Sequence, residues 1–208
     1  IFIGAGSRYE KPEQAGVSHF VEHLCFKGAK KRATAKDIAE AIEGVGGIIN
    51  GGTDKEATVY WVKVARHHFP LALDVLADIV RHSKFEPEEM EKERHVIIEE
   101  LSMSLDAPHI RVNMLIDEVL WPNQALGRDV LGTKETISTL TRDTALNYMS
   151  QQYTPPNMVV AVAGDIGHDE VLTSLTQAFA DWPGGMAGNW YPAEDAEGQP
   201  RLLVEYKK

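Results

Sequence analysis

The amino-acid sequence predicts an α+β fold, because short runs typical of strands alternate with longer segments typical of helices. In the helical segments apolar residues recur every three or four positions, whereas the strand-like runs are rich in β-branched and aromatic residues. The chain has 208 residues, 43% of them hydrophobic and 25% charged, as in globular proteins of one large or two small domains. The sequence therefore indicates a folded chain.

The first elements are a strand and two helices. Residues 1–6 read as the middle of a strand, and residues 18–26 as a helical stretch. Thr34 is a suitable N-cap with Asp37 three positions later, so the second helix is expected to begin there and to end at the glycine pair 46–47.

Two neighbouring strands are expected next, over 48–50 and 58–64, because both runs favour extended structure. Gly51 and Gly52 between them mark a bulge, a turn or a close backbone approach. One of the two strands is a candidate for an exposed sheet edge.

A long acidic helix is expected from Pro87 to about Leu105, because proline suits the first helical turn and Glu88 and Glu89 suit its positive end. The same patterns predict the remaining helices at 69–80, 110–120, 141–152 and 168–180, and the remaining strands at 158–163 and 202–206.

Composition also excludes some functions. The formal net charge is −10 and no basic patch appears beyond Lys27–Arg32, which argues against a nucleic-acid binder. No apolar run approaches the roughly 20 residues that cross a bilayer, so no membrane span is expected. Cys25 is the only cysteine, which excludes an intrachain disulfide and fits a core position in a reducing compartment.

The chemistry-bearing motif is H-x-x-E-H over residues 19–23, the inverted zincin arrangement. A four-residue gap on a helix puts His19 and His23 on one face, as two imidazole ligands of a zinc ion require. Glu22 can reach a water on the metal without being a ligand, which is the geometry of a general base. The motif predicts one catalytic zinc.

A third ligand is expected on the long acidic helix, which offers Glu93, Glu99 and Glu100. Glu93 and Glu100 are seven residues apart and share a face with Val96 and Ile97, whereas Glu99 is rotated by roughly 100° from Glu100. Two carboxylates on an inward-facing apolar stripe are costly unless a cation compensates them.

The chain resembles the N-terminal catalytic domain of the pitrilysin family of zinc peptidases, which includes insulinase and the mitochondrial processing peptidase. The matching segments extend over nearly the whole chain: residues 4–10, 15–16, 26–28, 46–53, 93–100, 131–133, 153–155 and 163–165.

This resemblance implies the roles of the candidate site residues. Glu100 follows His23 by 77 residues (100 − 23), a spacing that in this family selects Glu100 as the third zinc ligand and rejects Glu99. Glu93 is then the acid that supports a ligand from outside the coordination sphere. The implied reaction is peptide hydrolysis, with Glu22 as general base and a zinc-bound water as nucleophile.

The resemblance also implies a fold and partners. The expected fold is a mainly antiparallel sheet with helices packed on one face, the metallohydrolase fold of the processing peptidases. The family binds its peptide substrate as an added strand, for which Asn50, Gly51 and Thr53 are the expected contacts. A C-terminal domain or a partner subunit is expected to complete the enzyme.

We therefore expect a zinc-binding catalytic domain over 1–181, truncated at its N-terminus, and a linker with a lead-in strand over 182–208 toward a missing C-terminal domain. A bacterial cytoplasmic location is expected, with an organellar matrix or the periplasm as alternatives because a targeting peptide would lie upstream.

Two other functions compete with peptide hydrolysis. The first is a noncatalytic structural or partner subunit of the same fold, against which the complete set His19, Glu22, His23 and Glu100 argues. The second is a small-molecule zinc lyase that shares the motif, which is not expected to share the segment 46–53.

Overall fold

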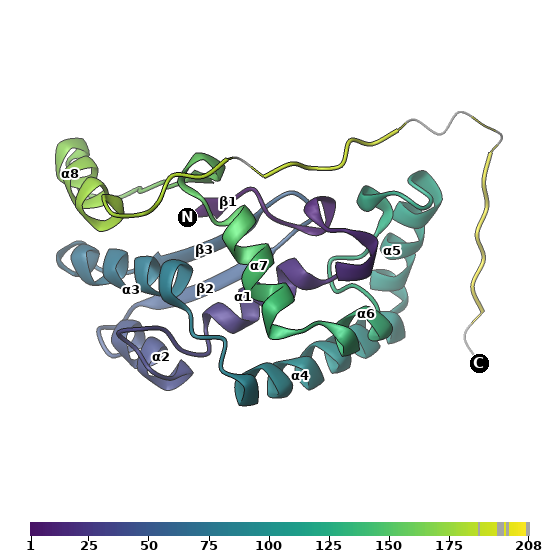
Figure 1. Ribbon diagram of the computed structural model, residues 1–208, viewed down its shortest axis with the longest axis horizontal. Coiled ribbons are helices and arrows are strands. Elements are labelled where there is room, and N and C mark those ends of the chain that lie inside the picture. Colours follow the sequence, from purple (N-terminus) through teal and green to yellow (C-terminus); the bar gives the residue numbers. More distant parts are fainter. Residues whose placement is uncertain (187, 195–197, 199, 207–208) are drawn as a thin grey trace.

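The strands form one antiparallel sheet in the computed structural model, which describes residues 1–186, 188–194, 198 and 200–206 (Figure 1). Its order is β2-β3-β1-β4, with bounds β1 Phe2–Ile3, β2 Ile48–Thr53, β3 Thr58–Lys63 and β4 Met158–Val159. β2 lies at one edge and pairs along its whole length with β3. The predicted α+β class is confirmed.

Eight α-helices are present in the described residues: α1 Val17–Cys25, α2 Ala35–Glu43, α3 Phe69–His82, α4 Pro87–Asp106, α5 Pro108–Leu120, α6 Lys134–Thr139, α7 Arg142–Gln152 and α8 His168–Phe179. Five short 3-10 helices accompany them: η1 Ser7–Tyr9, η2 Pro12–Gln14, η3 Arg66–His68, η4 Ala125–Gly127 and η5 Pro155–Asn157. The helices expected from sequence are confirmed, and the Thr34 hydroxyl caps α2 in a capping box with Asp37.

Five elements differ from expectation. The first strand is limited to Phe2–Ile3 of the expected residues 1–6, and β2 continues past the expected 48–50 through Gly51 and Gly52 to Thr53. The strand expected over 158–163 is limited to Met158–Val159, because its partner β1 is itself only two residues long. No strand forms over 202–206, where no described strand lies alongside to supply hydrogen bonds. Helix α6 escaped prediction because six residues are too few for a periodic pattern; a box between Thr133 and Thr136 caps it.

The sheet presents one face to the helices and leaves the other open. Thr58 and Tyr60 of β3 are fully buried, whereas Trp61, on the opposite face of the strand, is 41% exposed. Helices α1 and α2 contact β2, and α3 contacts β3 (Figure 1). Phe2 and Val159 are exposed with Trp61. The alternation of period two along β3 accounts for this division.

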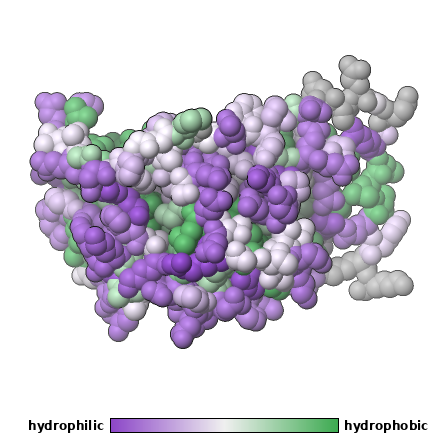
Figure 2. Space-filling view, viewed as in Figure 1, coloured by the Kyte–Doolittle hydropathy of each residue, from purple (hydrophilic) through white to green (hydrophobic). Residues whose placement is uncertain are grey.

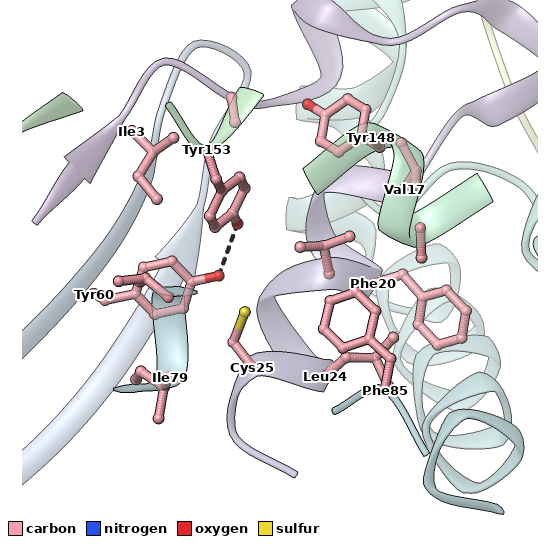
Figure 3. Close-up of a cluster of buried hydrophobic side chains, with 14 of the residues drawn as sticks. Ile3, Val17, Phe20, Leu24, Cys25, Tyr60, Ile79, Phe85, Tyr148 and Tyr153 are labelled. Atoms are coloured by element: carbon pink, nitrogen blue, oxygen red, sulfur yellow. Dashed lines mark hydrogen bonds between the residues drawn. The ribbon is translucent and has the colours of Figure 1, made fainter. Parts of the chain in front are cut away.

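The core lies between the sheet and α1, α3 and α7. Tyr60 of β3 and Tyr153 after α7 share a hydrogen bond of 2.8 Å between their hydroxyls, beside the Cys25 side chain (Figure 3). Cys25 is fully buried, and burial raises the pKa of its thiol to about 12. The expectation that Cys25 is a core residue is confirmed.

The surface is mainly hydrophilic on the side shown in Figure 2. Apolar side chains gather at its right edge on the C-terminal segment, where Leu202, Leu203 and Val204 are exposed. Among the described helices none combines the length and the apolar character needed to cross a bilayer.

Candidate metal centre

Helix α1 begins on a buried carboxylate. Both oxygens of Glu10 accept hydrogen bonds, from the backbone N–H groups of Gly16 and Ser18, each at 2.8 Å. The Ser18 hydroxyl also bonds the Tyr148 hydroxyl of α7 at 2.7 Å. These acceptors satisfy two N–H groups at the helix N-terminus that lack partners within the helix, so the contacts fix the helix that carries the histidine motif. Sequence reasoning missed this role of Glu10.

Helix α4 lies against α1 and brings the acidic residues to the motif (Figure 1). Glu93, Ile97 and Leu101 are buried on its inner face. Val96, expected to share that face, is 42% exposed. The inner face therefore follows the spacing of four from Glu93 through Ile97 to Leu101, and Glu100 lies at its margin.

Three nitrogen and oxygen atoms from the two helices converge. His19 Nε2 lies 3.2 Å from His23 Nε2, and Glu100 Oε2 lies 3.9 Å from the first and 3.7 Å from the second. These three side chains form the one cluster of potential metal ligands found among the described residues. Glu99, the rejected alternative, is exposed.

The donor set fits zinc. Bonds of about 2.0–2.1 Å in a tetrahedron separate neighbouring ligand atoms by about 3.3 Å. The two histidine nitrogens lie at 3.2 Å, and Glu100 Oε2 lies somewhat farther from them, at 3.7 and 3.9 Å. The 3.2 Å approach of two imidazole nitrogens, with a carboxylate oxygen beside them, is an arrangement that a cation stabilises. Three protein ligands also leave the fourth position of a tetrahedron for water, as in catalytic sites.

Glu22 lies on the same helix, facing strand β2. It is 8% exposed, and the Thr53 hydroxyl of β2 donates to its Oε2 at 3.3 Å. A Cβ atom on Gly51 would lie only 2.9 Å from Glu22 Oε1, so the glycine marks a close backbone approach, one of the three roles expected for it. Asn50 is exposed, and its side chain accepts from the Gly51 N–H at 2.8 Å.

Glu93 lies behind His23. Its Oε2 is 2.9 Å from His23 Nδ1, and its Oε1 is 2.7 Å from the Lys27 ammonium. The side chain of Glu93 is only 6% exposed. His19 differs from His23, because its buried Nδ1 has no hydrogen-bond partner within the described part of the chain. Lys27 was not among the expected site residues, because it follows the end of α1 and pairs with Glu93 on another helix, a contact that no local spacing signals.

Two protein-family models match the chain. The family model of insulinase, peptidase family M16, matches residues 1–134. The chain belongs to this family. The model of the peptidase M16 inactive domain matches residues 139–208.

Relatives of this M16 chain are named zinc proteases. It is 44% identical to the uncharacterized zinc protease YmxG of Bacillus subtilis over 182 residues, which are 88% of this chain and 44% of that protein. It is 37% identical over 189 residues to an uncharacterized zinc protease of Rickettsia felis, with shares of 91% and 46%. The chain thus spans less than half the length of these relatives.

Solved M16 structures share the fold. A protease from Helicobacter pylori gives a TM-score of 0.88 at 22% identity, covering 94% of this chain and 47% of that one. The periplasmic protease PqqL of Escherichia coli gives 0.83 at 27% identity, covering 93% and 22%. A peptidase M16 inactive domain from Pseudomonas fluorescens gives 0.84 at 18% identity, covering 94% and 47%.

The electrostatics of this M16 site separate the two histidines. Burial, reinforced by the neighbouring His23, lowers the pKa of His19 to about 3. Burial also opposes protonation of His23, but the hydrogen bond to Glu93 and the charges of Glu22, Glu100 and Glu93 outweigh it and raise that pKa. His19 is therefore the neutral imidazole and His23 the one that holds a proton most readily.

The pKa values of Glu22 and Glu93 shift in opposite directions. Burial raises the pKa of Glu22, and the nearby His23 and the Thr53 hydroxyl oppose this rise. Burial acts the same way on Glu93, but hydrogen bonds from His23 and Lys27 outweigh it and lower that pKa. A carboxyl group with a raised pKa suits proton transfer near neutral pH, whereas one with a lowered pKa stays ionised as a support.

Proposed function

We propose that this chain is the catalytic half of a zinc-dependent endopeptidase that hydrolyses peptides held in an extended conformation. The observation that carries the proposal is the convergence of His19, His23 and Glu100 on one point, with the separate carboxyl group of Glu22 beside them. One zinc per chain is part of the proposal, and the single such cluster among the described residues supports it.

The zinc ligands and the general base have separate roles. His19, His23 and Glu100 would hold zinc, which when bound acts as a Lewis acid that activates water and polarises a scissile carbonyl. Glu22 removes a proton from the attacking water and then delivers it to the leaving nitrogen. Its burial favours the protonated state that the second transfer needs.

The edge strand β2 supplies a place for the substrate. It lies at the end of the sheet order next to Glu22, and its residues Gly51 and Thr53 face that carboxylate. An extended peptide that pairs with this edge would lie along the catalytic residues. Asn50, exposed on the same strand, would contact the peptide from the outer side.

A second half is part of the proposal. The M16 relatives are more than twice as long as the matched region, and residues 139–208 match the model of the family's other domain type. We therefore infer that a further domain or a partner subunit completes the substrate site.

Metal content and hydrolysis of a quenched fluorescent peptide test the proposal together. Together with its second half, the zinc-loaded protein should cleave the peptide and lose activity with a chelator. Glu22→Gln should retain zinc and lose cleavage, whereas His19→Ala should lose both. Glu99→Gln, an exposed carboxylate on α4, serves as the control and should change neither. Cleavage by Glu22→Gln at the parent rate would disprove the general-base role.

The competing function is a noncatalytic subunit of the M16 fold. The observation in its favour is the match of residues 139–208 to the inactive-domain model. A protein that binds zinc but cleaves no peptide, alone or with its second half, would support this alternative. A zinc lyase is disfavoured by membership in the peptidase family.

A further inference from the structure

The ion pair between Lys27 and Glu93 lies behind the proposed zinc site. Lys27 follows the end of α1, where its backbone N–H donates to the Leu24 carbonyl at 3.1 Å. The next residue, Gly28, accepts from the Lys84 N–H at 3.0 Å. Lys27 therefore starts from a fixed turn and reaches across to Glu93 on α4, with its side chain 28% exposed.

The two oxygens of Glu93 have different partners. Oε2 contacts His23 Nδ1 at 2.9 Å, and Oε1 contacts the Lys27 ammonium at 2.7 Å. With a side chain only 6% exposed, the carboxylate has little access to water as a substitute partner. Each contact therefore constrains how the carboxylate can turn, and the ammonium holds the oxygen that His23 does not use.

The orientation of His23 depends on this carboxylate. When Glu93 accepts from Nδ1, the His23 proton stays on that nitrogen and Nε2 keeps its lone pair toward His19 and Glu100. Loss of Lys27 would leave a buried carboxylate oxygen unpaired, so Glu93 would turn toward other donors and release the imidazole. His19 has no such support, because its Nδ1 has no partner among the described residues.

We infer that Lys27 is a positioning residue of the metal centre, which acts through Glu93 to aim His23 Nε2 at the ion. This inference rests on the proposed zinc site. The inference and simple charge repulsion predict opposite changes in zinc affinity when Lys27 is removed. A lysine that acted only as a positive charge near a cation would weaken zinc binding, so its removal would tighten it. A lysine that orients a ligand strengthens binding, so its removal weakens it.

Zinc affinity of the 208-residue chain tests the inference, by competition with a chromophoric chelator. Lys27→Met should bind zinc about 10-fold more weakly, the low end of the range for residues behind a ligand. Lys27→Arg, which keeps charge and donors, should recover most of the affinity, and Lys27→Gln should lie between them. Lys36→Met, whose side chain is 79% exposed on α2, is the matched control and should equal the parent.

A second readout reports ligand geometry without catalysis. Cobalt(II) should give a visible absorption spectrum that changes in Lys27→Met and returns toward the parent in Lys27→Arg. If Lys27→Met does not fold in far-UV circular dichroism, the comparison of Gln with Arg still decides the matter. Equal or tighter zinc binding by the Gln or Met variant would overturn the inference.

The same titration separates this inference from the metal site itself. His19→Ala should lose zinc binding. If His19→Ala binds zinc like the parent, the proposed site is wrong. If His19→Ala loses zinc while the Lys27 variants keep the parent affinity, the site stands and only the role of Lys27 fails.

Discussion

The Thr53 hydroxyl donates to the Glu22 carboxylate at 3.3 Å, which joins the edge strand β2 to the motif helix α1. A second hydroxyl, that of Thr58 on β3, lies 3.4 Å from Thr53 Oγ1 and also donates to the Ala5 carbonyl. Thr53 was expected to contact the substrate, and that role stays a prediction. The geometry adds a contact with the proposed base.

Removal of the Thr53 hydroxyl should shift the acid limb of activity. The hydrogen bond from Thr53 lowers the pKa of Glu22, so Thr53→Val should raise that pKa further. Because a general base works only when ionised, the acid limb of the pH profile of kcat should move to higher pH. Thr53→Ser keeps the hydroxyl and should leave the limb in place; an unmoved limb in the valine variant would show that the contact is not functional.

The two neighbouring glutamates of α4 should differ in zinc binding. Substitution of a residue that only supports a ligand weakens metal binding by roughly 10- to 100-fold. Glu100→Ala should weaken zinc binding by more than this, because it removes a donor atom. Glu99→Ala should have no effect, since that side chain is exposed. Isothermal titration with zinc measures both, and equal losses in the two variants would contradict the choice of Glu100.

Zinc affinity should fall as the pH is lowered, because zinc must displace one proton from the histidine pair. Zinc needs both imidazoles neutral, and the pKa of His23 is raised above 6.5 whereas that of His19 is about 3. As pH falls through the pKa of His23, zinc must displace one proton from this pair, and the affinity should drop by about tenfold per pH unit. Competition titrations between about pH 5 and 8 test this; a fall of about 100-fold per unit would mean that both histidines titrate.

The two glycines of β2 should respond differently to alanine. Gly52 has open space where a Cβ would lie and no positive φ, so Gly52→Ala should stabilise the protein by about 0.4–1 kcal/mol through the unfolded chain. At Gly51 the added Cβ would meet Glu22 and Phe26 at 2.9 Å, which should cancel that gain. Urea unfolding compares the two, and equal stabilities would show that the contact at Gly51 relaxes freely.

The sequence alone determined the local elements and the candidate donors. The four-residue spacing of His19 and His23 sets one helix face, and the Thr34 cap sets the start of α2, because these signals act between residues close in the chain. The preference for Glu100 over Glu99 needed the family resemblance as well as the helical period.

Only the tertiary structure decided which distant groups meet. The carboxylate of Glu10 under α1, the Thr53 contact with Glu22 and the Lys27–Glu93–His23 chain each join residues whose pairing depends on how elements pack. Strand length was also decided there, since β4 extends only as far as β1 offers partners. Packing and hydrogen-bond pairing act through space, and no local period encodes them.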